Sequence, residues 1–463
     1  MALGSALKFL WPFGRRETPE DEGYFPIAAT VVPHRDAHGA SRQRPDFPTF
    51  RASALDRPLD RRREERREIT RARFALATYF TPTQPVADRS SFAGRLGVLA
   101  RLISSIESQR SHVVLYGERG IGKTSLLHVL ADVARESSYI VSYATCGANA
   151  NFSDLFRAVL QDVPLLFHRE VAPNAGEAES GGSLADRLPA GKFGAGELAD
   201  LCADVTGTRV LIILDEYDRV EDTAFRQQVA ELIKNLSDRA ARVQLVIAGV
   251  ASNLQELIGY VPSIRRNVIG LPMPRLEESE VQEMIALGET ASGVRFDPNL
   301  TRIIHLLALG SPYFARLLCH HAAVEALDQG RLTVDQGHLR RALDASIVEM
   351  EGRMAPRTVL EMRKFVGGRY DPLLAALGEA SRSIDGWFGG RAVVELLPGA
   401  PITAQQVEQE LAGLTTQLGL ETDVVDGERR FRFTDDTLPI YLWLMVGRLR
   451  LDSGTLEDAL ATV

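Results

Sequence analysis

The chain has 463 residues, of which 45% are hydrophobic and 25% are charged, and its net charge is −8 with a pI near 5.7. This length and composition are typical of a globular protein with two or three domains, and the acidic balance argues against attraction of the whole chain to nucleic acid or anionic lipid. Three scattered cysteines exclude a disulfide framework and a CxxC metal site and favour a reducing, cytoplasmic location.

Residues 1–78 are interpreted as an N-terminal extension. Residues 1 to about 55 are rich in Pro, Arg, Asp and Gly without sustained periodicity, so we expect them to be poorly ordered. The stretch "DRPLDRRREERREITRARFA" (56–75) places Glu and Arg at helical spacing and predicts an exposed, charged helix. The alternatives for this helix are a solvated face and an arm that contacts nucleic acid or a partner.

An α/β pattern extends over residues 79–275. Short apolar runs predict parallel strands, and amphipathic stretches between them predict helices that cover both faces of the sheet. The predicted strands are 112–117, 139–145, 209–215, 243–249 and 267–270, and the predicted helices are 123–136, 152–163, 195–206 and 223–237. Residues 170–196 interrupt the pattern with Gly, Ala and Pro, and we expect a long, mobile loop or insertion there.

Two further domains are expected after this region. Residues 276–354 are helical almost throughout and predict a helical lid. In 355–463, the stretch "LETDVVDGERRFRFTDD" predicts a β-hairpin with its turn at Asp426-Gly427, and "LPIYLWLM" (438–445) predicts a core helix or strand. A preceding helix carries four apolar residues on one face: Val407, Leu411, Leu414 and Leu418. A helix followed by a hairpin suggests a winged-helix domain.

The stretch "GERGIGKTS" (117–125) matches the pattern G-x-x-x-x-G-K-[ST], with a predicted strand before it and a helix after it. Its glycines let the backbone turn tightly and bring amides close to phosphate oxygens, while the helix adds a partial positive charge. We expect Lys123 to reach the terminal phosphates of ATP, Thr124 to bind Mg²⁺ and Ser125 to bond an inner phosphate. The predicted ATP-binding residues are Gly117, Glu118, Arg119, Gly120, Ile121, Gly122, Lys123, Thr124 and Ser125.

The stretch "RVLIILDEYDRV" (209–220) ends an apolar run in adjacent acids, which would be costly to bury alone. Asp215 is predicted to hold Mg²⁺ together with Thr124, largely through the water shell of the ion. Glu216 is predicted to act as the catalytic base that polarises the water attacking the γ-phosphate. Asp218 has no single interpretation, and Asp222 is predicted to cap the helix that begins at 223.

Together these motifs make the chain resemble the AAA+/STAND class of P-loop ATPases, with the closest likeness to the origin-recognition-like and STAND branch. "FAGR" (92–95) resembles the F-x-G-R box at the start of such modules, and "FTPTQPV" (80–86) resembles the linker that runs over the nucleotide base. The resemblance covers roughly residues 80–350. It implies an α/β fold with a P-loop parallel sheet of the AAA+ type, a helical lid and a C-terminal winged helix.

The resemblance also implies two further catalytic residues. Asn253, or Ser252 beside it, stands where such ATPases keep a polar sensor of the γ-phosphate, although Asn253 could equally cap the helix that begins at Leu254. Arg266, with Arg265 as second choice, stands where the family often has an arginine that reaches the nucleotide of a neighbouring subunit. The alternative for this pair is a solvated loop.

The stretch "GSPYFAR" (310–316) resembles the G-x-P element of STAND proteins, in which Gly310 and Pro312 would open a lid helix. Pro312 is therefore added to the predicted nucleotide-binding residues. The chain departs from the arginine-based second sensor of many AAA+ proteins, because Tyr313 occupies that place and Arg316 lies one turn further on. A standard second-sensor role is accordingly in doubt.

The expected function is an ATP-binding, slowly hydrolysing switch whose nucleotide state controls self-assembly into a homo-oligomer and engagement of a separate effector protein, in signalling or defence. The alternative is a DNA-associated ATPase of the initiator, loader or transposition-regulator type, which contacts DNA non-specifically through the winged helix and the arm at 57–73. The candidate recognition helix, 403–418, has no Lys or Arg, although the hairpin carries Arg429, Arg430 and Arg432. An overall acidic winged-helix region favours the switch, and the intact motifs disfavour a non-enzymatic scaffold.

Overall fold

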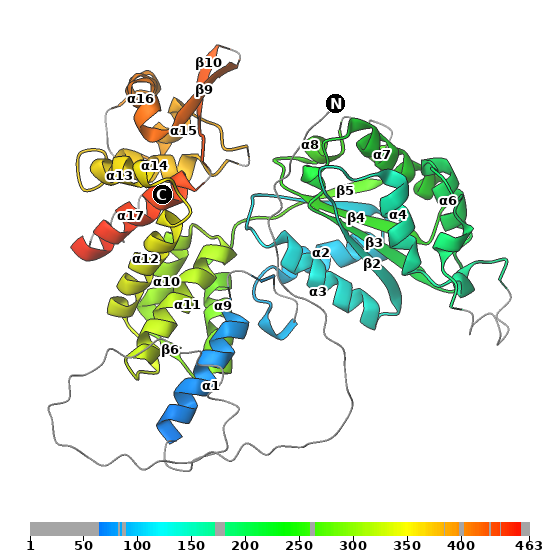
Figure 1. The fold of residues 1–463 in the computed structure, drawn as a ribbon, viewed down its shortest axis with the longest axis horizontal. Helices are drawn as coiled ribbons and strands as arrows, with labels where there is room; N and C mark the ends of the chain where they lie inside the picture. Colours follow the sequence, from blue (N-terminus) through cyan, green and yellow to red (C-terminus); the bar gives the residue numbers. More distant parts are fainter. Residues whose placement is uncertain are drawn as a thin grey trace, which may run out of the picture. The chain divides into compact units, whose positions relative to one another are not determined.

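The computed structural model describes residues 64–81, 84–85, 89–171, 181–259, 264–383, 385–397, 402–425, 427–435 and 437–454 (Figure 1). The predictions for residues 1–63, for part of the 80–86 linker and for Asp426 lie outside these ranges.

A five-stranded parallel sheet forms the centre of the α/β region. Its strands are ordered β2-β3-β4-β1-β5, and every neighbouring pair is parallel. The strands are β1 (His112–Tyr116), β2 (Tyr139–Thr145), β3 (Arg209–Asp215), β4 (Val243–Gly249) and β5 (Val268–Pro272). The predicted parallel sheet is therefore confirmed, and the strand bounds agree with the sequence pattern to within two residues.

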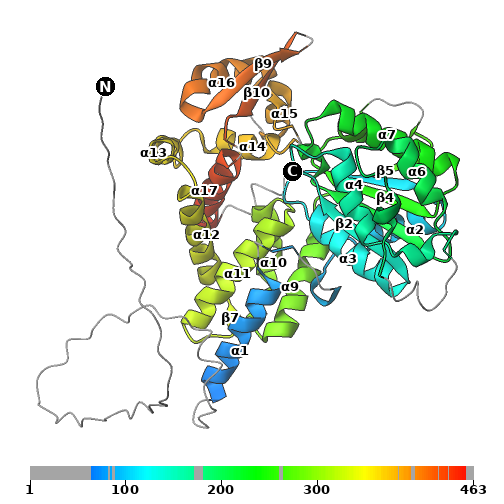
Figure 2. The same ribbon diagram turned by 45° about the vertical axis from the view of Figure 1, so that its right-hand side comes forward.

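Helices cover both faces of this sheet (Figures 1 and 2). On one face lie α2 (Leu96–Glu107) and α3 (Lys123–Glu136), and their apolar sides share a core with Val113, Leu115 and Ile213. The other face packs against α4, α6 and α7 through the alternate strand residues, such as Val114 and Leu214. These helices are α4 (Phe152–Gln161), α6 (Ala195–Ala203) and α7 (Thr223–Asp238), and the short α8 (Leu254–Ile258) follows β4. Burial on both faces explains why the strands are continuous apolar runs.

The segment 170–196 was expected to be a long, mobile loop, but its second half is structured and partly buried. Residues 184–187 form a short 3-10 helix, η4 (Leu184–Arg187), after another, η3 (Leu165–Phe167). Leu184 and Phe193 are buried in the core beside α4. The physical reason is that this Gly- and Ala-rich stretch still carries spaced apolar residues, which anchor it. Residues 172–180 lie outside the described part.

A helical lobe follows the sheet. It consists of α9 (Glu278–Ser292), α10 (Pro298–Ala308), α11 (Pro312–Asp328) and α12 (Gln336–Glu351), with a two-residue parallel ladder of β6 (Arg295–Phe296) and β7 (Thr333–Val334). The predicted helical character of this segment is confirmed.

The charged helix near the N-terminus packs on this lobe. It is α1 (Glu64–Tyr79), and it lies against α9 and α11 (Figures 1 and 2). Ala72, Leu76 and Phe80 are completely buried, and the Phe80 ring sits so close to Gly288 that a Cβ there would clash. Within the predicted range 56–75 the expected exposure is wrong at Ala72, and α1 continues beyond that range with Leu76 on the same buried side. Phe80, at the start of the predicted nucleotide linker, belongs to the lobe's core.

The C-terminal segment joins helices to a small antiparallel sheet of order β8-β10-β9. Its elements are α13 (Pro356–Phe365), α14 (Asp371–Ala380), β8 (Phe388–Gly389), α15 (Gly390–Glu395), α16 (Ala404–Leu418), β9 (Leu420–Val425), β10 (Glu428–Phe433) and α17 (Leu438–Ser453). The predicted hairpin pairs β9 with β10, and "LPIYLWLM" begins a buried helix rather than a strand.

One continuous hydrophobic core runs from α1 through the helical lobe to α17. Trp443 of α17 donates from Nε1 to the carbonyl of Leu307 in α10 at 2.9 Å, and Tyr441 donates to Glu351 of α12 at 2.7 Å. The predicted boundary near residue 355 therefore does not coincide with a break in the packing.

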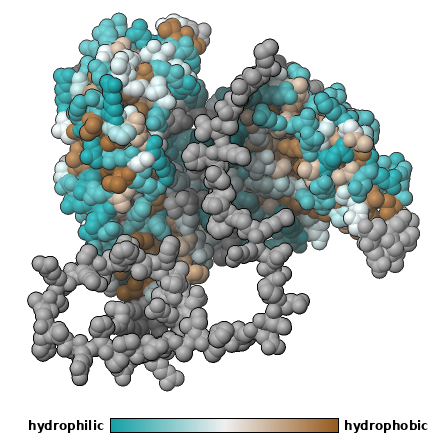
Figure 3. All heavy atoms as spheres, viewed as in Figure 1, coloured by the Kyte–Doolittle hydropathy of each residue, from teal (hydrophilic) through white to brown (hydrophobic). Residues whose placement is uncertain are grey.

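Within the part of the chain that the structure describes, no helix is both long and apolar enough to cross a membrane. The face drawn in Figure 3 is mostly hydrophilic, with apolar residues scattered over it rather than gathered in one area. Scattered apolar residues are normal on protein surfaces.

His112 at the start of β1 generates a prediction about stability and pH. Its buried ring accepts a hydrogen bond at Nδ1 from the Leu245 amide at 2.9 Å, and burial lowers the pKa of His112 to about 4. The unfolded chain binds the proton more readily, so the stabilising effect of neutral His112 is present above pH 6.5 and is lost as the pH falls toward 4. Between pH 7 and pH 5 we expect this residue to remove about 2 kcal/mol from the free energy of unfolding.

Denaturant unfolding at both pH values checks this. His112→Asn keeps an acceptor for the Leu245 amide but does not titrate. Between pH 7 and pH 5, its free energy of unfolding should therefore fall by about 2 kcal/mol less than that of the wild type. Equal losses in the two proteins would contradict the prediction.

Candidate nucleotide-binding site

The loop between β1 and α3 forms the predicted phosphate cradle. Gly120 and Gly122 have φ of +73° and +93°, a region that residues with a Cβ avoid, and Gly122 occupies the position before the first residue of α3. This conformation turns the backbone sharply into the helix, so the positive end of the α3 dipole lies at the loop. The buried side chain of Ile121 anchors the loop in the core that α2 and α3 form with one face of the sheet. Arg119 is exposed.

Lys123, the first residue of α3, has its ammonium group inside the cradle. Its Nζ donates to the carbonyl oxygens of Gly117 at 2.9 Å and Glu118 at 2.7 Å, and the side chain is largely buried. Burial lowers the pKa of Lys123 to about 8, and the charges of Asp218 and Asp215 oppose that shift. A cation held by neutral carbonyls in a desolvated site is a strong attractor for a polyanion such as a triphosphate.

Asp215 at the end of β3 is a buried carboxylate with three donors. Its Oδ2 accepts from the hydroxyl of Thr124 at 2.8 Å and from the hydroxyl of Tyr143 at 2.6 Å, and its Oδ1 accepts from the amide of Glu216 at 2.8 Å. Thr124 and Asp215, the two predicted metal ligands, are therefore in direct contact. Tyr143 was not predicted, since it belongs to β2 and no sequence spacing connects it with Asp215.

These oxygens fit a magnesium ion. Mg²⁺ prefers hydroxyl, carboxylate and water ligands and keeps several of its waters. The Thr124 hydroxyl can donate its proton to Asp215 while its lone pairs face a cation, and Asp215 retains an acceptor position on Oδ1. The residues present thus offer the chemistry that an ion accompanying ATP requires.

Glu216, the predicted base, has a conformation unusual for a residue with a side chain, with φ of +53°. Its carboxylate is half-exposed and forms an ion pair with Arg219 at 2.7 Å. The partner arginine is the last residue of the 3-10 turn η5 (Tyr217–Arg219). Glu216 therefore stands beside Asp215 in the chain but is held by a cation in this structure.

The other acids after β3 have structural partners. Asp218 accepts from the amide of Val250 at 2.9 Å and so connects the ends of β3 and β4. Asp222 accepts from the amide of Ala224 and caps α7, as predicted.

The predicted sensor and arginine positions lie on the carboxyl side of β4 and beyond. Asn253 caps α8 by accepting from the amide of Glu256 at 3.1 Å, which is the alternative that the sequence left open, and Ser252 bonds the same glutamate. Arg265 and Arg266 are both exposed. A role for Asn253 or Arg266 in nucleotide chemistry stays a prediction.

The lid helix α11 begins beside the cradle. Pro312 is its first residue, and the Pro312 side chain would lie 3.6 Å from a Cβ placed on Gly122, while Tyr313 lies at 3.9 Å from the equivalent position on Gly120. Arg316 points elsewhere: it is mostly buried, its Nη2 donates to the carbonyl of Ser91 at 3.2 Å, and its Nε has no partner. Tyr313, not Arg316, is thus the neighbour of the glycine loop.

The FAGR stretch connects the start of α2 with α9. The amide of Gly94 donates to Glu283 at 2.9 Å, and the amide of Arg95 donates to Glu280 at 2.6 Å. The Arg95 side chain is buried, and desolvation lowers its pKa to about 10. In this chain, residues 92–95 therefore connect the α/β region to α9, the first helix of the helical lobe, through these hydrogen bonds.

Glu118 carries a charge cluster that sequence reasoning did not foresee. Its carboxylate accepts from Arg275 at 3.0 Å and from Arg382 at 3.3 Å, and Arg275 also donates to Glu379 at 2.6 Å. Arg382 is nearly buried and donates in addition to the carbonyl of Leu309 at 2.7 Å. Glu118 belongs to the cradle, whereas Glu379 and Arg382 belong to α14 and the turn after it, so more than 260 residues of sequence separate the partners.

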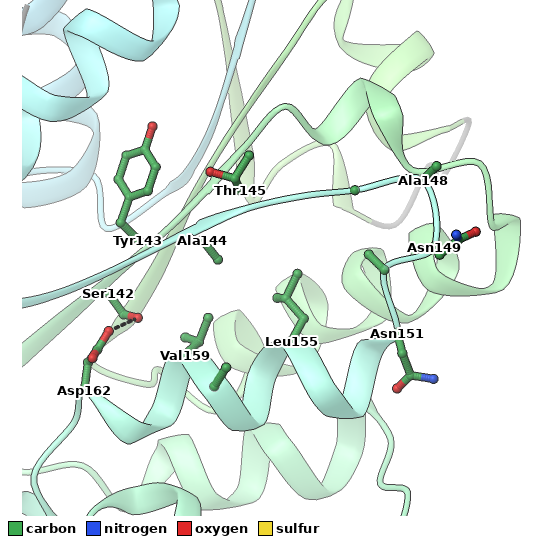
Figure 4. A pocket seen from close by; sticks show the side chains of 13 residues that line it. Ser142, Tyr143, Ala144, Thr145, Ala148, Asn149, Asn151, Leu155, Val159 and Asp162 are labelled. Atoms are coloured by element: carbon green, nitrogen blue, oxygen red, sulfur yellow. Dashed lines mark hydrogen bonds between the residues drawn. The ribbon is translucent and has the colours of Figure 1, made fainter. Parts of the chain in front are cut away.

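A separate groove lies beside the predicted ATP site. Figure 4 shows a groove between β2 and α4, where Ser142 bonds Asp162 at 2.6 Å. None of its lining residues belongs to the predicted ATP site.

Comparisons with known proteins bear on this site. Residues 91–247 match the family model described as AAA ATPase domain. No curated protein sequence matches the chain.

Three solved structures illustrate the structural similarity. The Aeropyrum pernix ORC1 protein in complex with DNA is 19% identical, covers 81% of this chain and 98% of its own, and has a TM-score of 0.40. Cdc6p from Pyrobaculum aerophilum is 16% identical and covers 82% and 98%, with a TM-score of 0.43. The Thermotoga maritima RuvB Holliday junction branch migration motor is 15% identical and covers 77% and 96%, with a TM-score of 0.40. The matched residues 91–247 include both the glycine-rich loop and the acids at the end of β3.

Proposed function

We propose that the chain is an ATP-binding and slowly hydrolysing switch whose nucleotide state is transmitted to the C-terminal segment. The observation that carries this proposal is the double ion pair of Glu118 with Arg275 and Arg382. It joins a residue of the phosphate cradle to the turn after α14. A triphosphate beside Glu118 would change the field at both arginines, so nucleotide occupancy and the position of the C-terminal segment are energetically coupled.

The hydrolytic roles follow from the contacts of the cradle. Lys123 and the amides of α3 would hold the phosphates, Thr124 and Asp215 would hold Mg²⁺, and Glu216 would orient the attacking water. Glu216 must exchange Arg219 for a water before it acts as a base. That requirement is consistent with slow turnover.

The surrounding segments receive corresponding roles. Residues 79–275 act as the ATPase core, 276–354 as the lid and 355–463 as a winged-helix-like domain, in which α16 precedes the β9–β10 hairpin. Pro312 and Tyr313 bring the lid to the glycine loop. Arg266, exposed after the region of α8, is proposed to reach the nucleotide of a neighbouring copy in a homo-oligomer.

The hairpin arginines bear on the choice of partner. Arg430 pairs with Asp423 at 3.0 Å and Arg432 pairs with Glu421 at 2.5 Å, and both guanidinium groups lie over the ring of Trp387. Cations already neutralised in this way contribute little to phosphate binding. This favours a protein effector over DNA, and a DNA-associated ATPase is retained as the second candidate because Arg429 of the same hairpin is exposed.

Glu216→Gln is expected to keep ATP binding and to lower turnover by about 100-fold or more, because the base is lost while the cradle is intact. Phosphate release under single-turnover conditions and titration with a fluorescent ATP analogue measure the two properties. Glu221→Gln, on the same exposed loop, is the matched control and should behave like the wild type. Lys123→Ala provides the non-binding reference. Full turnover in Glu216→Gln would remove this residue from the proposed role.

Arg382→Ala is expected to weaken ATP binding about tenfold, because the Glu118 carboxylate would be left less neutralised beside the phosphates. Glu118→Gln should restore most of that affinity, which corresponds to a coupling energy of about 1–2 kcal/mol in a double-mutant cycle. Arg391→Ala removes an exposed ion pair of the same domain and serves as the control. Hydrogen exchange of α14 with and without nucleotide provides the second measurement. Single effects that simply add, with unchanged exchange in α14, would refute the coupling.

Sizing of the protein with ADP and with a slowly hydrolysed ATP analogue, each with and without DNA, tests the assembly. We expect a larger species with the ATP analogue, independent of DNA, and expect Arg266→Ala to lose it. Assembly that needs both ATP and DNA would favour the DNA-associated candidate. A size that ignores the nucleotide in every condition would contradict the switch.

A further inference from the structure

We infer that Tyr143 is a positioning residue of the magnesium site, which fixes the carboxylate of Asp215, and that His128 holds the Tyr143 ring in place. This inference rests on the proposed function, because it assigns residues to the metal that accompanies ATP.

The strand register brings Tyr143 to Asp215. In the parallel pair of β2 and β3, Tyr143 is opposite Ile213 and Thr145 is opposite Asp215. Side chains alternate along a strand, so Tyr143, Ile213 and Asp215 all lie on the face that packs against α3. Figure 4 shows the consequence, since Tyr143 points away from α4 while Ser142, the preceding residue, points toward Asp162. The hydroxyl of Tyr143 thereby reaches Oδ2 of Asp215 at 2.6 Å.

The contact with Tyr143 limits the acceptor positions that Asp215 has left for a hydrated metal ion. A carboxylate has about four lone-pair positions, two on each oxygen. On Asp215 the hydroxyls of Thr124 and Tyr143 fill both positions of Oδ2, and the amide of Glu216 fills one position of Oδ1. One position on Oδ1 is left for a water of the hydrated ion. Removal of the Tyr143 hydroxyl would free a second position and let the carboxylate turn about its last torsion.

His128 supports the tyrosine from the helix. It follows Thr124 by four residues on α3, one turn later, so both side chains lie on the same side of the helix. The His128 ring stacks on the Tyr143 ring, with centroids 4.9 Å apart and planes inclined by 5°. Helix α3 therefore contacts this arrangement twice, through the Thr124 hydroxyl at Asp215 and through the His128 ring at Tyr143.

The sequence offers a matched control for the hydroxyl. Tyr139 belongs to the same strand and the same face as Tyr143, and its hydroxyl accepts from Arg209 at 3.1 Å instead of contacting Asp215. Tyr143→Phe and Tyr139→Phe remove the same atom from the same strand face. Only the first removal touches the proposed metal site.

The experiment measures binding of a fluorescent ATP analogue to the full chain as a function of Mg²⁺ concentration, and in EDTA. For Tyr143→Phe we expect the Mg²⁺ concentration at half-maximal binding to rise about tenfold, the lower end of typical effects of outer-sphere residues on metal affinity. Binding in EDTA should be unchanged. Tyr139→Phe should match the wild type in both conditions.

A second pair of variants covers the case in which Tyr143→Phe does not fold. His128→Ala removes the stacked ring, whereas His128→Phe keeps an aromatic ring, and we expect a rise in the Mg²⁺ requirement in the first that the second largely rescues. The inference is overturned if both Tyr143→Phe and His128→Ala keep the wild-type Mg²⁺ dependence, or if they weaken binding equally in EDTA, as a purely structural role would. A wild-type protein that binds the analogue in neither condition overturns the proposed function itself, and this inference with it.

Discussion

Asp215 is a carboxylate buried at the end of a buried strand, and without partners such an ion would cost several kcal/mol. Three donors offset that cost, and each comes from a different element: Thr124 from α3, Tyr143 from β2 and the Glu216 amide from the turn after β3. The requirement to satisfy one charge thus sets the distance of the cradle helix from the sheet. It also explains why the turn after β3 takes a strained conformation at Glu216, whose amide must face back to the carboxylate.

Glu118 connects the chemistry of the cradle with the rest of the chain. Its backbone carbonyl accepts from Lys123, while its carboxylate accepts from Arg275 and Arg382. Glu118 is therefore bonded both to Lys123, which would meet the phosphates, and to Arg382, which belongs to the C-terminal segment. Arg382 is desolvated, and its pKa is lowered to about 10 by that burial, so its interaction with Glu118 is little screened by solvent. Glu379, with one carboxylate oxygen buried and unpartnered, is the least satisfied member of the cluster.

The sequence predicts those parts of this architecture that local pattern controls. Continuous apolar runs indicate buried parallel strands, and the glycine-rich loop and the acids after 209–215 lie at the carboxyl edge of the sheet in the structure. The Asp222 cap and the 420–433 hairpin follow from short-range rules as well. Contacts between distant segments can be predicted only where both partners belong to recognisable motifs, as Thr124 and Asp215 do. Tyr143 meets Asp215 through strand register, and Glu118 meets Arg382 across more than half the chain, so neither pair has a spacing to detect. The many arginines of α1 indicate an exposed helix and obscure its apolar side, on which Ala72 and Leu76 are buried.

The packing of α1 on α9 and α11 has a mechanical consequence. The chain enters the helical lobe first, leaves it to build the α/β region, and returns to it at α9, so the two bodies are joined by two covalent crossings rather than one. A body tethered at two points cannot swivel freely; its easiest motion is rotation about the line through both tethers. Gly94 and Arg95 fasten the first crossing to α9, and Arg275 lies on the second. Glu118 of the glycine-rich loop therefore contacts the second crossing directly, through Arg275.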